Sequence, residues 1–223
     1  MPRGRRYRRD TVSRPGRPTL VLLVRHGTTP TTGQKLPGRA PGLHLSDEGR
    51  RQAEAAARRI APLRRVAAVY ASPLERARET AMPIARARGL ALRIDRDLPD
   101  IDVGDWTGQS LARLRRRPEW ETVQRHPSGF RFPGGESFME VQSRMTQAVA
   151  RLADRHRGWT IVVVSHADPI KTVVAHALGT PLDLFQRFVI APASITVIVW
   201  RAGGPTLVTL NSLGGDLAAY GTR

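Results

Sequence analysis

Residues Leu20 to Gly27 read LVLLVRHG, a run of five apolar residues that ends in an arginine and a histidine. Uninterrupted apolar runs of this length are typical of strands covered on both faces of a parallel sheet. A second such run, Ile161 to Val164, is followed after Ser165 by another histidine, His166. Ligands bind open α/β sheets outside the carboxyl ends of the strands, so we expect His26 and His166 to share one crevice.

Helix start signals lie between these runs. They are Ser46 before a helix that reaches Ile60, Ser72-Pro73 with Glu75 three residues after the serine, Ser137 with Glu140 at the same spacing, and Asp168-Pro169 before a helix that ends near Gly179. A capping side chain, a proline in the first turn and a glutamate at the third position each favour a helix N-terminus. Arg76 is therefore expected in the first turn of its helix.

Weaker strand patterns occur at residues 67–71 and 91–95, and a hairpin is predicted from residues 194–200 and 207–210 across Gly203-Gly204-Pro205. The alternation of strands and helices predicts an α/β fold, a three-layer α/β/α arrangement with a mostly parallel central sheet and an edge hairpin. Residues 109–131, with two prolines and clustered charge, break the alternation. We expect a small cap insertion over a site there, about 109–135, within a domain spanning 19–223.

The chain is strongly basic, with 36 basic residues against 19 acidic ones and a net charge of +17. Residues 1–18 hold seven arginines and one aspartate and almost no apolar side chains, so we expect a disordered basic tail there. Lys35 and Lys171 are the only lysines, so the arginine bias runs along the whole chain and carries little functional information. Aromatic residues make up only 5%, and no basic helix interleaves them, so no nucleic-acid partner is expected.

The sequence has no cysteine and no apolar run near the ~20 residues of a membrane span. Disulfides, thiolate catalysis and cysteine metal sites are therefore excluded, and we expect a soluble cytoplasmic protein without membrane contact. A twin-arginine export signal is the alternative reading of the tail. The apolar run behind it is only Leu20 to Val24, however, and it leads straight into Arg25.

Two arginines lie where they could bind an anion beside the two histidines. Arg25 precedes His26, and Arg76 lies at a helix start whose backbone N–H groups also favour negative charge. Planar guanidinium groups match the oxygens of a phosphate. A solvated surface position is the alternative for Arg76, which has Arg78, Arg86 and Arg88 as neighbours.

Four segments in order resemble the histidine phosphatase superfamily, the group that includes phosphoglycerate mutases. They are Arg25-His26-Gly27-Thr28-Thr29, residues Ser72 to Thr80, Gly104-Asp105-Trp106-Thr107-Gly108, and Ser165-His166-Ala167. The resemblance covers roughly Thr19 to Asn211. It implies that His26 is the nucleophile and that Arg25, Arg76 and His166 bind the phosphate.

The resemblance also implies a carboxylic proton donor four residues before Gly104. The family usually has glutamate there, whereas this chain has Asp100, whose side chain is one methylene shorter. Asp102 is the rival donor, but Asp100 occupies the position that the resemblance implies and is favoured. At Thr32 many relatives have asparagine; the hydroxyl offers one donor where an amide offers two, so a weaker phosphate contact or an ordinary loop threonine is expected.

By resemblance, neutral His26 attacks phosphorus, Asp100 protonates the leaving oxygen, and water hydrolyses the phosphohistidine with Asp100 as base. Protonated His166 and the two arginines counter the charge of the transition state, and no metal or cofactor is expected. Phosphomonoester hydrolysis on a small phosphorylated substrate is favoured over mutase-type phosphoryl transfer. A phosphate-binding relative without turnover is the remaining alternative, because of the shorter acid. The arginines at 113, 115, 116, 117 and 125 could bind a highly anionic ester, but the favoured interpretation is that they are solvated residues of an exposed helix.

Overall fold

The computed structural model describes residues 16–220, and most of the predicted basic tail lies outside them. A six-stranded sheet with the order β3-β2-β4-β1-β5-β6 forms the centre. Its strands are β1 (Thr19–Arg25), β2 (Val66–Ala71), β3 (Leu92–Ile94), β4 (Thr160–Ser165), β5 (Ile195–Arg201) and β6 (Gly204–Ser212). The first four are mutually parallel, β5 runs antiparallel to β1, and β5 and β6 form the predicted edge hairpin.

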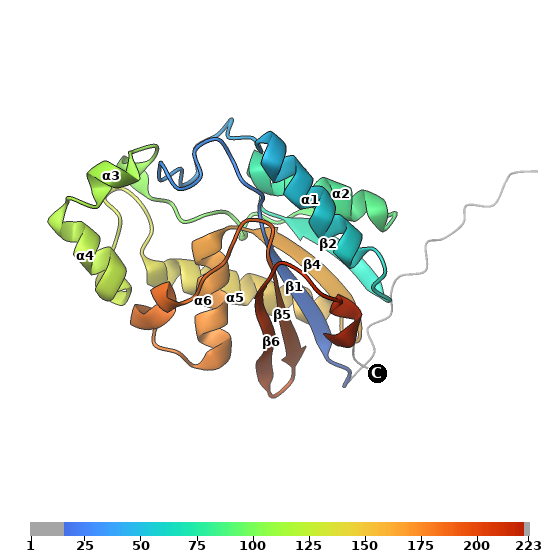
Figure 1. Ribbon diagram of the computed structural model, residues 1–223. Helices are drawn as coiled ribbons and strands as arrows, with labels where there is room; N and C mark the ends of the chain where they lie inside the picture. Colours follow the sequence, from blue (N-terminus) through green and yellow to red (C-terminus); the bar gives the residue numbers. More distant parts are fainter. Residues whose placement is uncertain (1–15, 221–223) are drawn as a thin grey trace, which may run out of the picture.

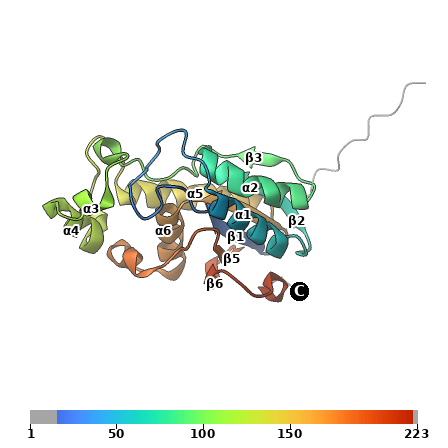
Figure 2. The ribbon, with the colours of Figure 1, turned by 45° about the horizontal axis from the view of Figure 1, so that its top comes forward.

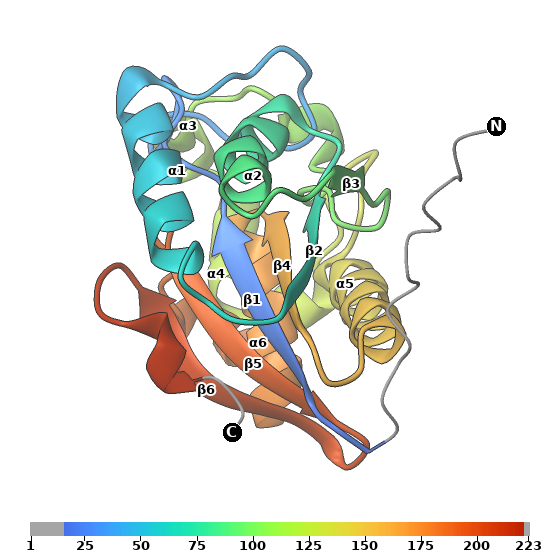
Figure 3. The ribbon, with the colours of Figure 1, turned by 90° about the vertical axis from the view of Figure 1, so that its right-hand side faces the viewer.

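Helices cover both faces of this sheet (Figure 1). They are α1 (Asp47–Ile60), α2 (Glu75–Ala87), α3 (Leu111–Leu114), α4 (Pro118–Arg125), α5 (Phe138–Arg155) and α6 (Ala167–Leu178). Figure 3 shows α1 and α2 on one side of β1, β2 and β4, with α5 on the other. The predicted three-layer α/β/α fold is therefore confirmed. Between residues 16 and 220, no helix combines the length and the apolar character that a bilayer crossing needs.

The alternation of side chains along β1 creates two separate cores. Leu20, Leu22 and Val24 pack with α1 and α2, whereas Val21 and Leu23 pack with α5 and α6. Strand β4 divides in the same way, with Ile161 and Val163 on the α5 side. Because both faces are buried, the two central strands are apolar throughout, as their sequences predicted.

Two predicted helix starts need correction. Helix α2 begins at Glu75 with Leu74 as its N-cap and no capping side chain, so Ser72 is not the cap. Ser72 instead continues the pairing of β2 with β4, because its N–H donates to the carbonyl of Val164 at 3.0 Å. Helix α6 begins at Ala167, one residue before the predicted Asp168. The caps predicted at Ser46 and Ser137 are confirmed, the second as a full capping box.

The predicted insertion contains α3, α4 and a 3₁₀ turn at Pro127–Gly129. Figure 2 shows α3 and α4 at one end of the molecule, beyond α6. Aromatic packing fixes this segment, with Trp106 stacked on Trp120 at 6.3 Å and edge-on to Phe132 at 5.3 Å between ring centroids. Its function as a cap, like the boundaries 19–223 and 109–135, stays a prediction.

Candidate active site

The register of the parallel strands brings the two histidines together. Val24 pairs with Val164 and Arg25 with Ser165, so His26 and His166 both follow paired residues. The His26 N–H donates to the Ser165 carbonyl at 3.0 Å, and the two imidazole rings lie 5.1 Å apart between centroids. The strand ends thus bring the two rings side by side, with His26 on the cavity wall and His166 fully buried behind it.

His26 is held in one orientation with one nitrogen available. Its Nδ1 lies 2.7 Å from the Gly27 carbonyl, so Nδ1 carries the hydrogen and donates it, and Nε2 keeps its lone pair. The side chain is buried, and burial, followed by the charges of Arg76 and Arg25, lowers the pKa of His26 well below its ordinary value. The residue is therefore neutral at physiological pH and suited to nucleophilic attack.

The nucleophile segment also packs closely against helix α1. A Cβ at Gly27 would meet the Gly49 carbonyl oxygen at 2.5 Å, and a Cβ at Gly49 would meet the Thr28 carbonyl oxygen at 2.0 Å. Both positions therefore require glycine. This contact brings the first turn of α1 against the backbone that carries His26.

Arg25 and Arg76 are both held by backbone carbonyls and still have donors available. Arg25 donates from Nη1 to Ile190 at 2.6 Å, and Arg76 donates from Nη2 to Gly38 at 2.8 Å. Among residues 16–220, the buried Nε of each arginine and Nη1 of Arg76 have no hydrogen-bond partner. Buried donors without acceptors are costly, and a phosphate in the crevice would accept from them. Arg76 is fully buried, so the alternative of a solvated helix residue is wrong.

His166 is fully buried and is fixed by Ser72. The Nε2 atom lies 2.9 Å from Ser72 Oγ, which also accepts from the Leu74 N–H at 3.3 Å. We assign the hydrogen of His166 to Nδ1, because Nδ1 faces the Asp100 carboxyl at 3.6 Å, and Nε2 then accepts from the Ser72 hydroxyl. Nδ1 makes no hydrogen bond among the described residues. Burial and then the charge of Arg76 lower the pKa of His166 well below its ordinary value.

The protonation of His166 expected at the transition state stays a prediction. Its environment favours the neutral ring, which can still donate one hydrogen bond from Nδ1. Positive charge at the crevice comes from the two arginines. A sequence cannot show how far burial and neighbouring cations shift the charge of a histidine.

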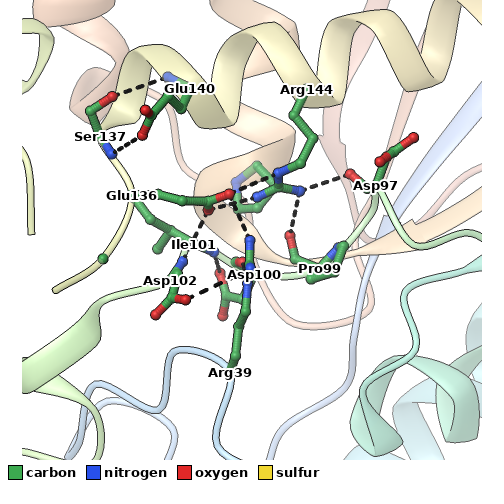
Figure 4. Close-up of polar contacts among 12 residues, drawn as sticks. Arg39, Asp97, Pro99, Asp100, Ile101, Asp102, Glu136, Ser137, Glu140 and Arg144 are labelled. Atoms are coloured by element: carbon green, nitrogen blue, oxygen red, sulfur yellow. Dashed lines mark hydrogen bonds and ion pairs between the residues drawn. The ribbon is translucent and has the colours of Figure 1, made fainter.

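Asp100 and Asp102, both labelled in Figure 4, have different partners and different exposure. The Asp100 carboxyl lies 3.1 Å from Arg76 Nη2 and 3.6 Å from His166 Nδ1, and its other oxygen accepts from the Ile101 N–H at 3.0 Å. The Asp102 side chain is 40% exposed and lies 3.8 Å from Arg39 Nη1. Burial raises the pKa of Asp100, the charge of Arg76 opposes that rise, and the charge of Asp168 adds to it.

A cavity of about 250 Å³ opens beside these groups. Its walls include Arg25, His26, Thr32 and Asp100, so most of the predicted site residues meet in one space. Thr32 Oγ1 accepts from the Thr29 N–H at 2.9 Å and lies 3.0 Å from Thr29 Oγ1. The predicted phosphate contact of Thr32 stays a prediction.

Three residues near this cavity have roles that the sequence did not suggest. Lys35 and Asp168 line it, and Ser72 binds His166. Ser72 directly follows strand β2, and Asp168 lies shortly after strand β4. This position at the strand ends could have identified both as candidate site residues. Lys35 lies in the loop between β1 and α1, and no local signal distinguished it. From the predicted cap, Leu111 reaches the cavity wall.

Curated relatives share much of this chain. It is 37% identical over 196 residues to a bifunctional protein of Mycobacterium tuberculosis, covering 87% of this chain and 54% of that protein. The chain thus spans about half the length of this relative. It is 30% identical over 204 residues to phosphoserine phosphatase 1 of Hydrogenobacter thermophilus, covering 86% of this chain and 91% of the relative.

Solved structures share the fold closely. A mycobacterial glucosyl-3-phosphoglycerate phosphatase superimposes with a TM-score of 0.79 at 27% identity, covering 88% of this chain and all of that one. The phosphoserine phosphatase of Entamoeba histolytica, solved with 3-phosphoglyceric acid, also gives 0.79 at 27% identity, over 87% and 97% of the two chains. The family profile of the histidine phosphatase superfamily (branch 1) matches residues 21–213. The chain belongs to this superfamily.

Proposed function

We propose that this chain hydrolyses small phosphomonoesters through a phosphohistidine on His26. One observation carries the proposal: a neutral, buried histidine whose Nδ1 is bound by Gly27 adjoins buried donors of Arg25, Arg76 and His166 that have no acceptor among the described residues. A phosphoryl group beside His26 Nε2 would satisfy these donors. The names of the phosphoserine and glucosyl-3-phosphoglycerate phosphatases agree with this chemistry.

In the first step the lone pair of His26 Nε2 attacks phosphorus and forms the P–N bond. The bond between phosphorus and the ester oxygen breaks, and its electron pair leaves with that oxygen. The Asp100 carboxyl transfers its proton to the leaving oxygen, so an alcohol departs. Arg25, Arg76 and the Nδ1–H of His166 stabilise the charge on the non-bridging oxygens.

In the second step water attacks the phosphohistidine. The Asp100 carboxylate takes a proton from the water as its oxygen bonds to phosphorus, the P–N bond breaks, and its electron pair returns to Nε2. Phosphate leaves, and both residues regain their starting forms. The sum is ester plus water giving alcohol plus phosphate.

The finer class we propose is an acid phosphatase. The reaction needs neutral His26 and protonated Asp100 together. The pKa of His26 is lowered, so its neutral form persists at lower pH, and the pKa of Asp100 is raised, so its protonated form persists at higher pH. The two required forms therefore coexist at mildly acidic pH.

A small substrate with a second anionic group fits the cavity best. Its volume of about 250 Å³ lies below the range of pockets for drug-sized ligands, roughly 300–1,000 Å³. Lys35 lines it, and within residues 16–220 the Lys35 side chain forms no ion pair or hydrogen bond. Phosphorylated hydroxy or amino acids combine a phosphate with a carboxylate that this ammonium group could bind.

Phosphate release from a chromogenic aryl phosphomonoester and from phosphoserine, measured between pH 4.5 and 7.5, tests the proposal. His26→Ala should abolish turnover and acid-labile phosphate incorporation, and His44→Ala, at a side chain that is 60% exposed, should keep both. Wild-type turnover in His26→Ala would overturn the proposal. Transfer of the phosphoryl group to an added alcohol in preference to water would indicate the mutase-type reaction, and binding of phosphate without any release would indicate a non-catalytic relative.

A further inference from the structure

The backbone that carries Asp100 is bound by three charged side chains from distant parts of the sequence (Figure 4). Arg144 Nη1 donates to the carbonyls of Asp97 at 2.7 Å and Pro99 at 3.1 Å. Arg39 Nε donates to the carbonyl of Asp100 itself at 2.9 Å. The segment has no regular secondary structure, so these side chains replace the hydrogen bonds that a sheet or helix would supply.

Glu136 binds the backbone of Asp102 and the side chains of both arginines. Its Oε2 accepts from the Asp102 N–H at 3.1 Å, and its own N–H donates to the Asp102 carbonyl at 2.8 Å. Its carboxylate also accepts from Arg39 Nη2 at 2.7 Å and from Arg144 Nε and Nη2 at 3.1 and 3.0 Å. The exposed fractions of the Arg39, Glu136 and Arg144 side chains are 33%, 20% and 16%. Such partly buried, multiply bonded ion pairs hold their geometry better than single surface pairs.

The Asp100 carboxyl projects from this clamped backbone toward Arg76 and His166. Arg76, which binds the Asp100 carboxyl, also donates to the carbonyl of Gly38, and the next residue, Arg39, donates to the carbonyl of Asp100. Gly38 and Arg39 are therefore connected to both the side chain and the backbone of Asp100. An aspartate has one rotatable bond fewer than a glutamate. A shift of its backbone therefore moves the carboxyl away from the leaving oxygen, and the side chain cannot compensate.

We propose that Arg39, Glu136 and Arg144 form a positioning cluster that sets the reach of the short proton donor Asp100. This inference rests on the proposed function and assigns the three residues no contact with substrate. The cluster fixes the backbone of residues 97–102, and that backbone places the proton. Loosening it should impair protonation of the leaving group more than attack by His26.

The leaving group distinguishes positioning from a general structural role. An aryl oxygen of low pKa departs without much help from an acid, whereas an alkyl oxygen needs the proton. Arg39→Gln removes the donor to the Asp100 carbonyl. We expect kcat/KM to fall roughly tenfold or more for phosphoserine and less than about threefold for p-nitrophenyl phosphate, a part of the range that general acids contribute.

Arg39→Lys and Arg151→Gln supply a milder variant and a matched control. The lysine keeps the charge but lacks the Nε donor, so it should show the same preference for the aryl substrate at smaller amplitude. Arg151 binds the carboxylates of Asp95 and of Asp97, at the start of the same segment, and among residues 16–220 it donates to none of the segment's backbone carbonyls. Arg151→Gln should change both substrates by less than about twofold. An equal fold-loss on both substrates in the Arg39 variants would overturn the inference, while phosphohistidine chemistry on His26 would stand.

A variant with a longer proton donor separates an effect on the position of the donor carboxyl from an effect on the stability of the fold. Asp100→Glu restores a longer donor that can adjust to a shifted backbone. Arg39→Gln should therefore cost less on phosphoserine in the Asp100→Glu background than in the wild-type background. The same fold-loss in both backgrounds would show that the cluster acts independently of donor length and would contradict the proposal.

Discussion

Ser72 Oγ and His166 Nε2 lie 2.9 Å apart, at the carboxyl ends of the neighbouring strands β2 and β4. In the tautomer assigned to His166, Ser72 donates to Nε2 and the hydrogen lies on Nδ1, on the side of the Asp100 carboxyl. Orientation of an imidazole by a hydrogen bond to its second nitrogen is a common way to select a tautomer. A serine that the sequence presents as a helix cap thus belongs to the phosphate site.

Ser72→Ala should lower kcat/KM roughly tenfold, about the value of one buried hydrogen bond. Without the hydroxyl, the His166 ring can turn or place its hydrogen on Nε2, and the donor toward phosphate is lost. Nitrogen NMR of the imidazole should show a mixture of tautomers in the variant and one form in the wild type. Ser143→Ala, at a serine that binds only the exposed Gln147, should leave both measurements unchanged.

Asp168 should tune the pH dependence of catalysis. Its negative charge raises the pKa of Asp100, so Asp168→Asn should lower that pKa and shift the loss of kcat/KM at high pH toward lower pH. The two profiles are compared with one substrate, so titration of the substrate cancels. Asp183→Asn, at a residue outside the cavity that binds the Ser128 N–H, is the control. A shift to higher pH in Asp168→Asn would contradict the assignment of Asp100 as acid.

Lys35 should select substrates that carry a carboxylate. Lys35→Met keeps much of the side-chain volume and removes the charge that lines the cavity. The KM for phosphoserine should rise several-fold, while kcat/KM for p-nitrophenyl phosphate should change by less than about twofold, because a rim charge acts on binding rather than on the reacting bond. Equal effects on the two substrates would remove Lys35 from substrate recognition.

The strand ends show what could be predicted from the sequence. Apolar runs before His26 and His166 define two parallel strands, and general topology then places both rings in one crevice. Residues two apart in an extended segment share a face, so alternation alone cannot separate Asp100 from Asp102. Their surroundings separate them instead, because Asp100 lines the cavity whereas the Asp102 side chain is 40% exposed.

Tertiary contacts account for what the sequence could not show. Ser72 before Pro73 satisfies every local rule for a cap, and only the adjacent β4 shows that its hydroxyl binds a histidine. Arg39 and Arg144 are two among many arginines, and the carboxylate that unites them, Glu136, lies far from one of them along the chain. The lowered pKa of His166 depends on burial and on Arg76, neither of which a local pattern contains.

His156 should make the fold sensitive to acid from a position remote from the crevice. It is buried, its Nε2 lies 2.9 Å from Tyr70 Oη, and burial lowers its pKa to about 4. The unfolded chain binds a proton on this residue near pH 6.5 and the folded chain only near 4, so the stabilisation is complete above 6.5 and is lost as pH falls toward 4. The expected loss is about 3 kcal/mol of unfolding free energy by pH 4.

Urea unfolding of the wild type and of the His156→Gln variant at pH 7 and pH 4.5 tests this prediction. The unfolding free energy should differ less between the two pH values in His156→Gln than in the wild type. The difference should be unchanged in His176→Gln, whose side chain is exposed. An undiminished difference in His156→Gln would assign the acid sensitivity to the histidines of the crevice instead.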